Sequence, residues 1–394
     1  MKSSRVVRRL GPQARLQAPP IQIAISLVVT GLVGGLYTLV WSSNWPGKVR
    51  FTDFAQLWVG ARLAEQEGLM AVYTDRYPQA LSRFGVIHAL YRYPPWTSLA
   101  FNQTFGRMGI LVGYELCTGL ILASMILAWA LLVKGTGWER AAHLIAFLAL
   151  PMVGFELWLA NLVGFEFALI TVVWWLAVRR KDWIAGLVLG FCLLKPQSVI
   201  LVAATLLVAG RPKIALAWAG FVACLGLITL RSVGWQGVST YQSILGQDAG
   251  NLTWIGHSLM AHIPYSERAV AQAMVIIATL VGAYRLRGLD PGVAIALGIL
   301  GSAALTPYFN IEDLSLAVLA GWLMLRVEWK TWVSVLLVLS YVGLMLLRLS
   351  EPFPWPWFAT ELTWLGLACW GLPGALNPTI NVAGTVQRPD PAAA

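Results

Sequence analysis

Asp53 is the first acidic residue in the sequence, and its side chain could act as a catalyst. It follows an apolar run that ends at Trp41, and Gln56 lies three residues after it. A polar residue with Gln three positions later is typical of a capping box, in which the two residues begin a helix. A carboxylate held at a membrane surface and partly desolvated could instead act as a general base. The spacing alone leaves both roles open.

Lys195, Pro196 and Gln197 form the most unusual motif, because they interrupt an apolar stretch. Apolar runs cover residues 183–194 before them and 198–209 after them. A lysine inside a membrane region costs about 2.5–3.5 kcal/mol on insertion scales, so it indicates a function unless its head group extends to the interface. Pro196 breaks the helix and frees polar backbone groups, which must line a cavity or contact protein. We therefore favour a functional cation at Lys195, and a fixed cation there suits a phosphate group.

Arg92 and Tyr93 precede two prolines, Pro94 and Pro95. Prolines favour the first turn of a helix, where the backbone N–H groups have no intrahelical partner. The simplest interpretation is a helix start. The functional interpretation adds that Arg92 and Tyr93 are then fixed at the outer interface, where they face the same space as Asp53.

A polar turn lies late in the chain, between two apolar runs. It extends from Thr306 to Asp313 and includes Tyr308 and Glu312. The two carboxylates of this turn could bind sugar hydroxyls or a metal ion, or they could simply be exposed to solvent. The pattern does not separate these alternatives.

Four further titratable residues lie near turns on the same side. Glu156 and Glu166 flank a short turn at Asn161, where they could line the same cavity or cap helix ends. His257 and His262 are five positions apart, and without a partner acid this spacing is only a weak metal signal. The sequence also has no glycine-rich motif of the kind that binds nucleotide phosphates. We therefore predict no cofactor and no metal site, with metal dependence undecided.

The composition indicates what kind of protein must position these residues. Of 394 residues, 58% are hydrophobic and only 12% are charged, and the mean hydropathy is +0.69. Soluble proteins carry about twice that share of charge, so these values exclude a soluble globular enzyme, a disordered chain and a nucleic-acid-binding module. We therefore predict an all-α polytopic membrane protein with the lipid bilayer as a partner and no nucleic acid.

Positive charges in the short breaks between apolar runs predict the orientation of the chain. The formal net charge is +10, and alternate breaks carry basic clusters such as 179–181. Short cytoplasmic loops are rich in Lys and Arg, so these breaks and the basic N-terminus are predicted to be cytoplasmic. With roughly 20 apolar residues for each span, we count about twelve transmembrane helices. The predicted outer side includes Asp53, Lys195, His257 and Asp313.

The predicted organisation is one membrane domain with polar ends and two large outer segments. In the first outer segment, apolar residues recur at helical spacing, which predicts a helix lying in the membrane interface. That face carries Phe54, Leu57, Trp58, Ala61 and Ala64. A short helix from Pro94 to Phe105 and one full span are predicted within 94–133, because Arg107 interrupts the apolar run. The predicted boundaries are 1–20 for the cytoplasmic N-terminus, 21–373 for the membrane domain with its first span at 21–41, 42–93 and 232–266 for the outer segments, and 374–394 for a disordered tail.

These residues, in this order, resemble glycosyltransferase family 87. The resemblance rests on an Asp after the first span, a Tyr-Pro-Pro at the end of the first outer segment, a Lys-Pro-Gln between short helices and a Pro-Tyr…Asp turn late in the chain. It covers roughly residues 20–350. The best-known members of the family are polyprenyl-phosphate-mannose-dependent alpha-mannosyltransferases with the GT-C membrane fold. The resemblance therefore implies a GT-C-type bundle of transmembrane helices.

Particular positions match the family's functional residues. The resemblance implies that Asp53 is the catalytic base. The other matching positions are Lys195-Pro196-Gln197 and Pro307-Tyr308 with Asp313. We predict that Lys195, Arg92 and Gln197 bind the donor phosphate, and that the sugar or acceptor is bound by Tyr93, His257, Tyr308, Glu312 and Asp313. Many members carry Gly-Gln-x-Asn where this chain reads Leu159 to Glu166 without Gly-Gln, so the sugar or the acceptor could differ.

The predicted function is a membrane glycosyltransferase of the cytoplasmic (inner) membrane, with its site on the extracytoplasmic side. It would move a hexose from a polyprenyl-phosphate sugar to a lipid-linked or glycan acceptor of the cell envelope, with inversion at the anomeric carbon; the resemblance implies mannose. A lipid-linked-oligosaccharide flippase or other transporter is the alternative, since it also explains intramembrane charge and broken helices. The long amphipathic outer segment argues against a transporter. A structural subunit without chemistry would leave Lys195 unexplained.

Overall fold

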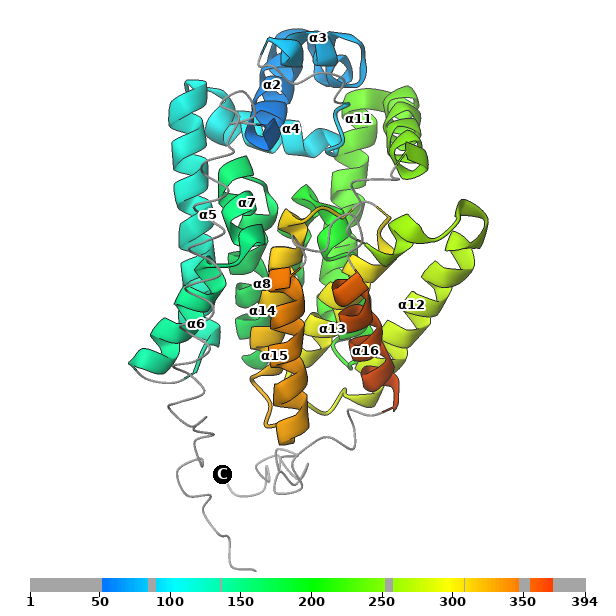
Figure 1. Cartoon of the computed structure of the whole chain (residues 1–394). Coiled ribbons are helices and arrows are strands. Elements are labelled where there is room, and N and C mark those ends of the chain that lie inside the picture. Colours follow the sequence, from blue (N-terminus) through cyan, green and yellow to red (C-terminus); the bar gives the residue numbers. More distant parts are fainter. Residues whose placement is uncertain are drawn as a thin grey trace, which may run out of the picture.

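The computed structural model describes residues 52–83, 90–134, 137–251, 258–307, 309–346 and 355–370. Within these residues all the regular elements are helices (Figure 1), which confirms the predicted all-α class. Several predicted segments lie outside the described residues. They are the N-terminus at 1–20, the first span at 21–41 and the tail at 374–394.

Three helices are long and apolar enough to cross a membrane in the described part of the chain. They are α5 (Ile110–Leu132), the portion Pro212–Gly246 of α11 (Pro212–Asn251), and α12 (Tyr265–Arg285). The crossings number four if α6 (Trp138–Leu148) and α7 (Pro151–Leu159) act as one span, with a bend of 65° between them. The chain is therefore a membrane protein by the length and composition of its helices. The total of about twelve spans stays a prediction, because the other apolar helices are shorter than a full crossing needs.

The centre of the bundle is α13 (Pro291–Leu305), which contacts α8, α10, α12, α14 and α16. Its residues Gly292 to Ala304 are all buried, as expected for a helix that is apolar on every side. Gly298 allows close packing, since an added Cβ would lie 2.6 Å from the Cα of Val202 on α10. The remaining helices of the bundle are α8 (Val163–Val178), α9 (Asp182–Phe191), α10 (Val202–Val208), α14 (Ser315–Met324), α15 (Thr331–Leu346) and α16 (Trp355–Trp370).

A layer of short helices covers one end of this bundle, at the top of Figure 1, and we call it the outer layer because it contains part of the segment predicted to face outward. The layer consists of α2 (Thr52–Glu67), the 3-10 turn η1 (Leu69–Tyr73), α3 (Arg76–Ser82), α4 (Pro95–Phe101) and the π-helical turn η2 (Asn102–Gly106). Phe54 fixes α2 to the layer, because its ring packs edge-on against Phe101 at 5.3 Å and Tyr114 of α5 at 5.7 Å. Of the apolar face predicted for this helix, Phe54, Leu57 and Ala61 are fully buried.

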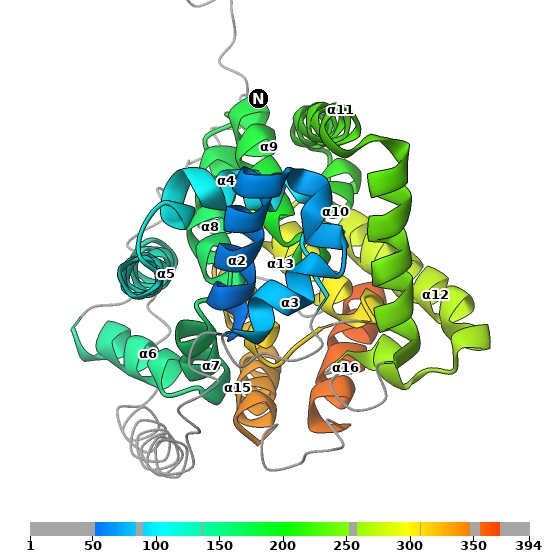
Figure 2. The same cartoon turned by 90° about the horizontal axis from the view of Figure 1, so that it is seen from above.

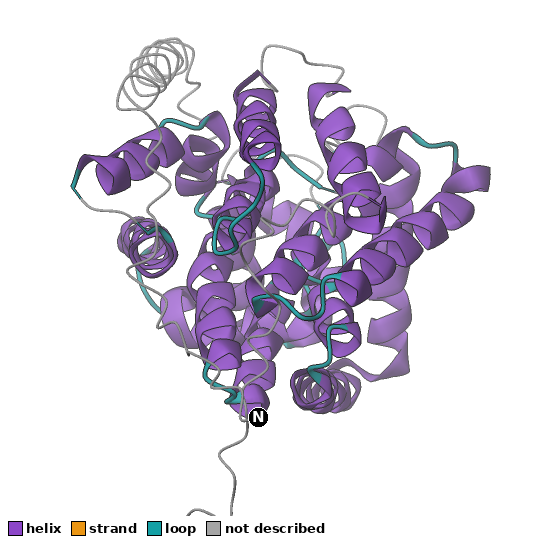
Figure 3. Cartoon of the chain, turned by 90° about the horizontal axis from the view of Figure 1, so that it is seen from below, coloured by secondary structure: helices purple, strands orange, loops and turns teal. Residues whose placement is uncertain are grey.

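The long helix α11 has two legs, because it bends at Gly234 (φ 64°, ψ −176°). This backbone conformation favours glycine, which lacks a Cβ. Figure 2 shows the first leg end-on and the second leg crossing the same end of the molecule as α2 and α3. Much of the outer segment predicted at 232–266 is therefore helical as far as Asn251, and the 3-10 turn η5 (Leu259–His262) follows residues outside the described part. The view from the other side, in Figure 3, again shows helices joined by short loops.

Two 3-10 turns break the chain at the Lys-Pro-Gln motif. They are η3 (Cys192–Leu194) and η4 (Pro196–Ser198), which lie between α9 and α10. The carbonyl groups freed by this break find donors on α4. The indole Nε1 of Trp96 donates to the carbonyl of Leu193 at 3.1 Å, and the Thr97 hydroxyl donates to the carbonyl of Leu194 at 3.3 Å. The predicted interruption by proline is thus present, and the outer layer holds the broken backbone in place.

Candidate active site

A cavity of about 360 Å³ lies where the outer layer meets the broken helices. Five of the residues predicted for the site line it: Asp53, Arg92, Tyr93, Lys195 and Gln197. Glu312 and Asp313 do not line it but contact residues that do. His257 and Tyr308 lie outside the described residues. The five predicted residues come from three separate stretches of sequence, and the cavity gathers them on one surface, as a binding site requires.

Lys195 is held by acceptors inside the protein and does not extend to water. Its side chain is only 4% exposed. The Nζ atom forms an ion pair with Asp313 and donates to Oδ1 of Asn161 at 3.0 Å. An ammonium group has three N–H donors, so two are used by these partners and the third can serve a ligand in the cavity.

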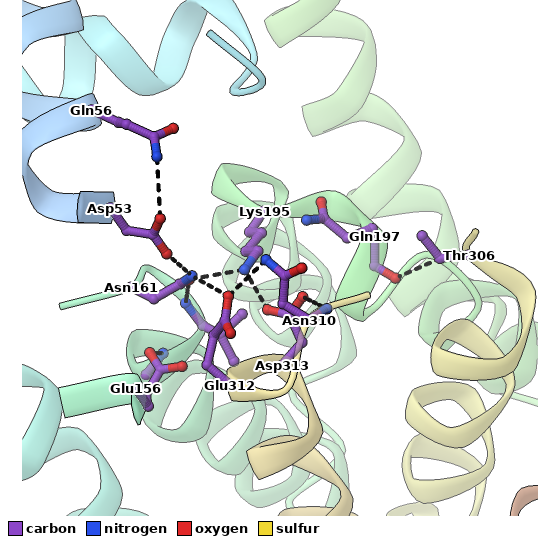
Figure 4. Close-up of polar contacts among 12 residues, drawn as sticks. Asp53, Gln56, Glu156, Asn161, Lys195, Gln197, Thr306, Asn310, Glu312 and Asp313 are labelled. Carbon is purple, nitrogen blue, oxygen red and sulfur yellow. Dashed lines mark hydrogen bonds and ion pairs between the residues drawn. The ribbon is translucent and has the colours of Figure 1, made fainter. Parts of the chain in front are cut away.

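Asn161 connects the charged residues of the site (Figure 4). It lies in the turn between α7 and α8, which is tight because Ala160 adopts a left-handed conformation (φ 48°). Its Nδ2 group donates to Oδ2 of Asp53 at 2.7 Å and to Oε1 of Glu312 at 3.3 Å. Its Oδ1 atom accepts from Lys195, and also from the backbone N–H of Val163 at 3.2 Å. Sequence reasoning assigned Asn161 no role, although a polar residue in an apolar turn between two glutamates was the available signal.

Asp53 faces this cluster from the start of α2. Both donors to its carboxylate, within the described residues, are side chains: Asn161, and Gln56 at 3.5 Å. Gln56 therefore contacts the Asp53 carboxylate itself. A capping role would require this carboxylate to accept from a backbone N–H group, and no such bond is present among the described residues. Burial raises the pKa of Asp53 above its ordinary value, while Lys195 and the Asn161 hydrogen bond oppose the rise. A carboxylate with a raised pKa beside a cavity has the properties of a general base.

The two acids of the late turn hold other residues of the site. They begin the 3-10 turn η6 (Glu312–Leu314) and are both buried. Asp313 pairs with Lys195 and accepts from the backbone N–H of Asn310 at 3.0 Å. Glu312 accepts from Nδ2 of Asn310 at 2.9 Å, in addition to its bond from Asn161. Burial and the neighbouring Asp313 raise the pKa of Glu312 to about 8, so this side chain is mostly uncharged at neutral pH.

The other cavity residues are positioned through their backbones. The Tyr73 hydroxyl donates to the carbonyl of Tyr93 at 2.9 Å, and the Tyr241 hydroxyl donates to the carbonyl of Arg92 at 3.5 Å. The Thr306 hydroxyl lies 3.2 Å from the carbonyl of Gln197 and 2.9 Å from that of Ser302, and it shares its single proton between the two. These bonds leave the side chains of Arg92 and Gln197 as part of the cavity lining.

Three other candidates lie away from the cavity lining. Glu156 accepts from the backbone N–H of Gly164 at 2.7 Å, so it caps the start of α8. Glu166 is buried in the first turn of the same helix α8. The His262 ring packs against Phe358 with ring centroids 5.0 Å apart. Among the described residues no three His, Cys, Asp or Glu side chains are grouped to hold a metal ion.

No protein family, curated protein or solved structure that we compared with the chain matches it. The resemblance to glycosyltransferase family 87 therefore stays a prediction. What the chain can do has to be inferred from the cavity itself. It combines a carboxylate suited to take a proton with a fixed cation, inside a membrane protein.

Proposed function

We propose that the chain is a glycosyltransferase that uses a polyprenyl-phosphate sugar as donor. It would transfer a hexose, with mannose the first candidate, to a lipid-linked or glycan acceptor outside the cytoplasmic membrane. The observation that carries the proposal is the single amide bridge between Asp53 and Lys195. Through Asn161, the carboxylate of Asp53 and the ammonium group of Lys195 are held on one cavity at fixed separation, which supports their proposed roles as base and phosphate-binding cation.

The proposed reaction assigns each of these groups one task. Asp53 accepts the proton of the acceptor hydroxyl as its oxygen attacks the anomeric carbon. The bond from that carbon to the phosphate oxygen breaks, and its electron pair leaves with the polyprenyl phosphate. Lys195 and Arg92 then stabilise the charge that develops on the leaving group, where a preorganised electrostatic environment contributes most. Attack on the side opposite the leaving group inverts the anomeric carbon.

The orientation of the protein supports an extracytoplasmic site. The cavity lies beside the N-terminal end of α8, at Asn161. The basic cluster Arg179-Arg180-Lys181 follows the other end of the same helix. Because short basic loops face the cytoplasm, the cavity is assigned to the opposite side. The alternation of basic breaks along the sequence also supports the proposed count of about twelve spans in a GT-C-type arrangement.

The proposal is tested by measuring sugar transfer by the purified protein from a panel of polyprenyl-phosphate sugars. Asp53→Asn keeps the shape but cannot take a proton, and its single oxygen can accept from Asn161 or from Gln56 but not from both. We expect at least a roughly 100-fold fall in turnover with unchanged donor binding, and a loss of thermal stability no larger than that of one hydrogen bond. Asp75→Asn is the matched control, because Asp75 is an exposed acid of the same outer layer and lies off the cavity.

Two outcomes would contradict the proposal. Near-normal turnover by Asp53→Asn would show that Asp53 is not the catalytic base. Movement of a lipid-linked sugar across vesicles, with no transfer from any donor, would instead favour the transporter.

A further inference from the structure

A second cavity of about 450 Å³ adjoins the first one. It lies between the start of α4 and the inner corner formed by the two legs of α11. Most of its lining residues are apolar or aromatic. We call it the α11 groove, and its main lining residues are Trp96, Gly226, Leu230, Val238, Tyr241 and Leu245.

The groove and the polar cavity share two side chains, Tyr241 and Leu245. These residues are four positions apart on the second leg of α11, so they lie on the same helix face. Tyr241 is fixed at this junction by its bond to the carbonyl of Arg92 and by its ring contact with Tyr73 at 5.7 Å. A ligand could therefore extend from the apolar groove past Tyr241 to the cations of the cavity.

The other end of the groove reaches the bilayer. Gly226 and Leu230 belong to the first leg of α11, which is long and apolar enough to cross a membrane. Their neighbours Leu227 and Ile228 are exposed by 68% and 49%, which in a membrane-spanning helix means contact with lipid. Gly226 leaves room there, since an added Cβ would meet no atom within 4 Å. The groove is therefore a side entrance from the membrane to the polar cavity.

We propose that the α11 groove binds the isoprenoid chain of the lipid phosphate, with Tyr241 marking the boundary between chain and phosphate. This inference rests on the proposed function and names the part of the donor that the groove takes. The occupant must be apolar at one end and anionic at the other. The groove supplies apolar walls, and Arg92 and Lys195 supply positive charge at the end beyond Tyr241.

The first experiment compares donors that carry the same sugar and phosphate on a long or a very short isoprenoid chain. Gly226→Leu puts a side chain into open space in the groove and also favours the helix, so the protein should fold. We expect the ratio of kcat/KM for the long-chain donor to that for the short-chain donor to fall at least tenfold. Gly220→Leu is the matched control, because Gly220 is equally open on the same helix but does not line the groove. An unchanged ratio in Gly226→Leu would overturn the proposal.

The second experiment does not depend on sugar transfer. A polyprenyl phosphate without sugar, carrying a photoreactive group on its chain, is cross-linked to the full-length wild-type protein in nanodiscs. We expect labelling of the α11 segment that contains Val238 and Leu245, reduced by unlabelled polyprenyl phosphate and not by phosphatidic acid. Equal competition by phosphatidic acid would show an acyl-lipid site and overturn the isoprenoid assignment, as would labelling elsewhere. Labelling of the groove in a protein that transfers no sugar would leave the groove assignment intact and refute the proposed function alone.

Discussion

Replacing Asn161 with alanine tests whether this amide tunes the proposed base. The substitution removes the 2.7 Å bond to Asp53 and the 3.0 Å bond to Lys195 together. Asp53 then keeps only its 3.5 Å contact with Gln56, and Lys195 keeps its ion pair with Asp313. The charged groups stay in the site, but the bridge that sets their separation is lost.

The expected size of the effect follows from the kind of bond. A hydrogen bond to a charged group contributes about 1.5–3 kcal/mol. One pH unit corresponds to about 1.4 kcal/mol, so losing the bond to the ionised Asp53 should raise the pKa of this side chain by about 1–2. Water in the cavity replaces part of the bond, which favours the lower value. The substitution also removes the bonds of Asn161 with Glu312 and Val163. Because these neighbouring bonds do not add, we expect a loss of about 2–4 kcal/mol in the free energy of unfolding.

The assay is the pH profile of kcat/KM for sugar transfer. Activity falls as the pH drops through the pKa of Asp53, and in Asn161→Ala this acidic limb should move up by about 1 pH unit. Asn161→Asp should move it further, because a like charge replaces the donor. Asn102→Ala is the control, since Asn102 is a buried amide of the outer layer that does not line the cavity.

An acidic limb that stays in place would refute this reasoning. If Asn161→Ala lowered thermal stability and turnover with an unchanged pH profile, Asn161 would only support the fold. The control separates the removal of a buried amide in general from an effect on Asp53, because Asn102→Ala should leave the limb in place.

Three further predictions follow from the same geometry. Lys195→Met should raise the donor KM or lower kcat at least tenfold while Lys195→Arg keeps part of the activity, and full activity in the Met variant would refute phosphate binding. Glu312 holds a proton up to about pH 8, so the wild-type donor KM should rise above that pH. The free energy of unfolding should fall as the pH rises from 4.5 to about 8, because the unfolded chain has already released this proton while the folded chain still holds it. Glu312→Gln should show neither change. In a chain without native cysteines, Arg76→Cys should react with an impermeant thiol reagent in intact cells and Lys181→Cys should not, and the reverse would overturn the orientation.

The sequence was informative where charge or proline conflicts with a membrane environment. Lys195 and Pro196 interrupt an apolar run, and the structure has a helix break at that point with the lysine on a cavity. Asp53 could be selected because it begins a helix whose apolar face is visible in the residue pattern. In both cases a local rule of solvation or periodicity was sufficient.

The partners of these residues could not be predicted in the same way. The bond between Asn161 and Asp53 joins positions 108 residues apart, and that between Lys195 and Asp313 joins positions 118 apart. No periodicity within one helix records such contacts, because they depend on how separate helices pack. The bend at Gly234 was not predicted from the sequence for another reason, since an isolated glycine within a helical stretch gives only a weak signal of a bend.

The pairing of Lys195 with Asp313 limits how the proposed phosphate site can work. Replacing a buried ion pair with apolar residues is often neutral or even stabilising, so the pair is a poor device for stability alone. We infer that its value lies in keeping Lys195 charged and in place while the cavity is empty. If a phosphate had to displace Asp313, a buried carboxylate would be left without its cation, at a cost of several kcal/mol. The third N–H of Lys195 avoids that cost, and the ion pair can therefore persist while the donor is bound.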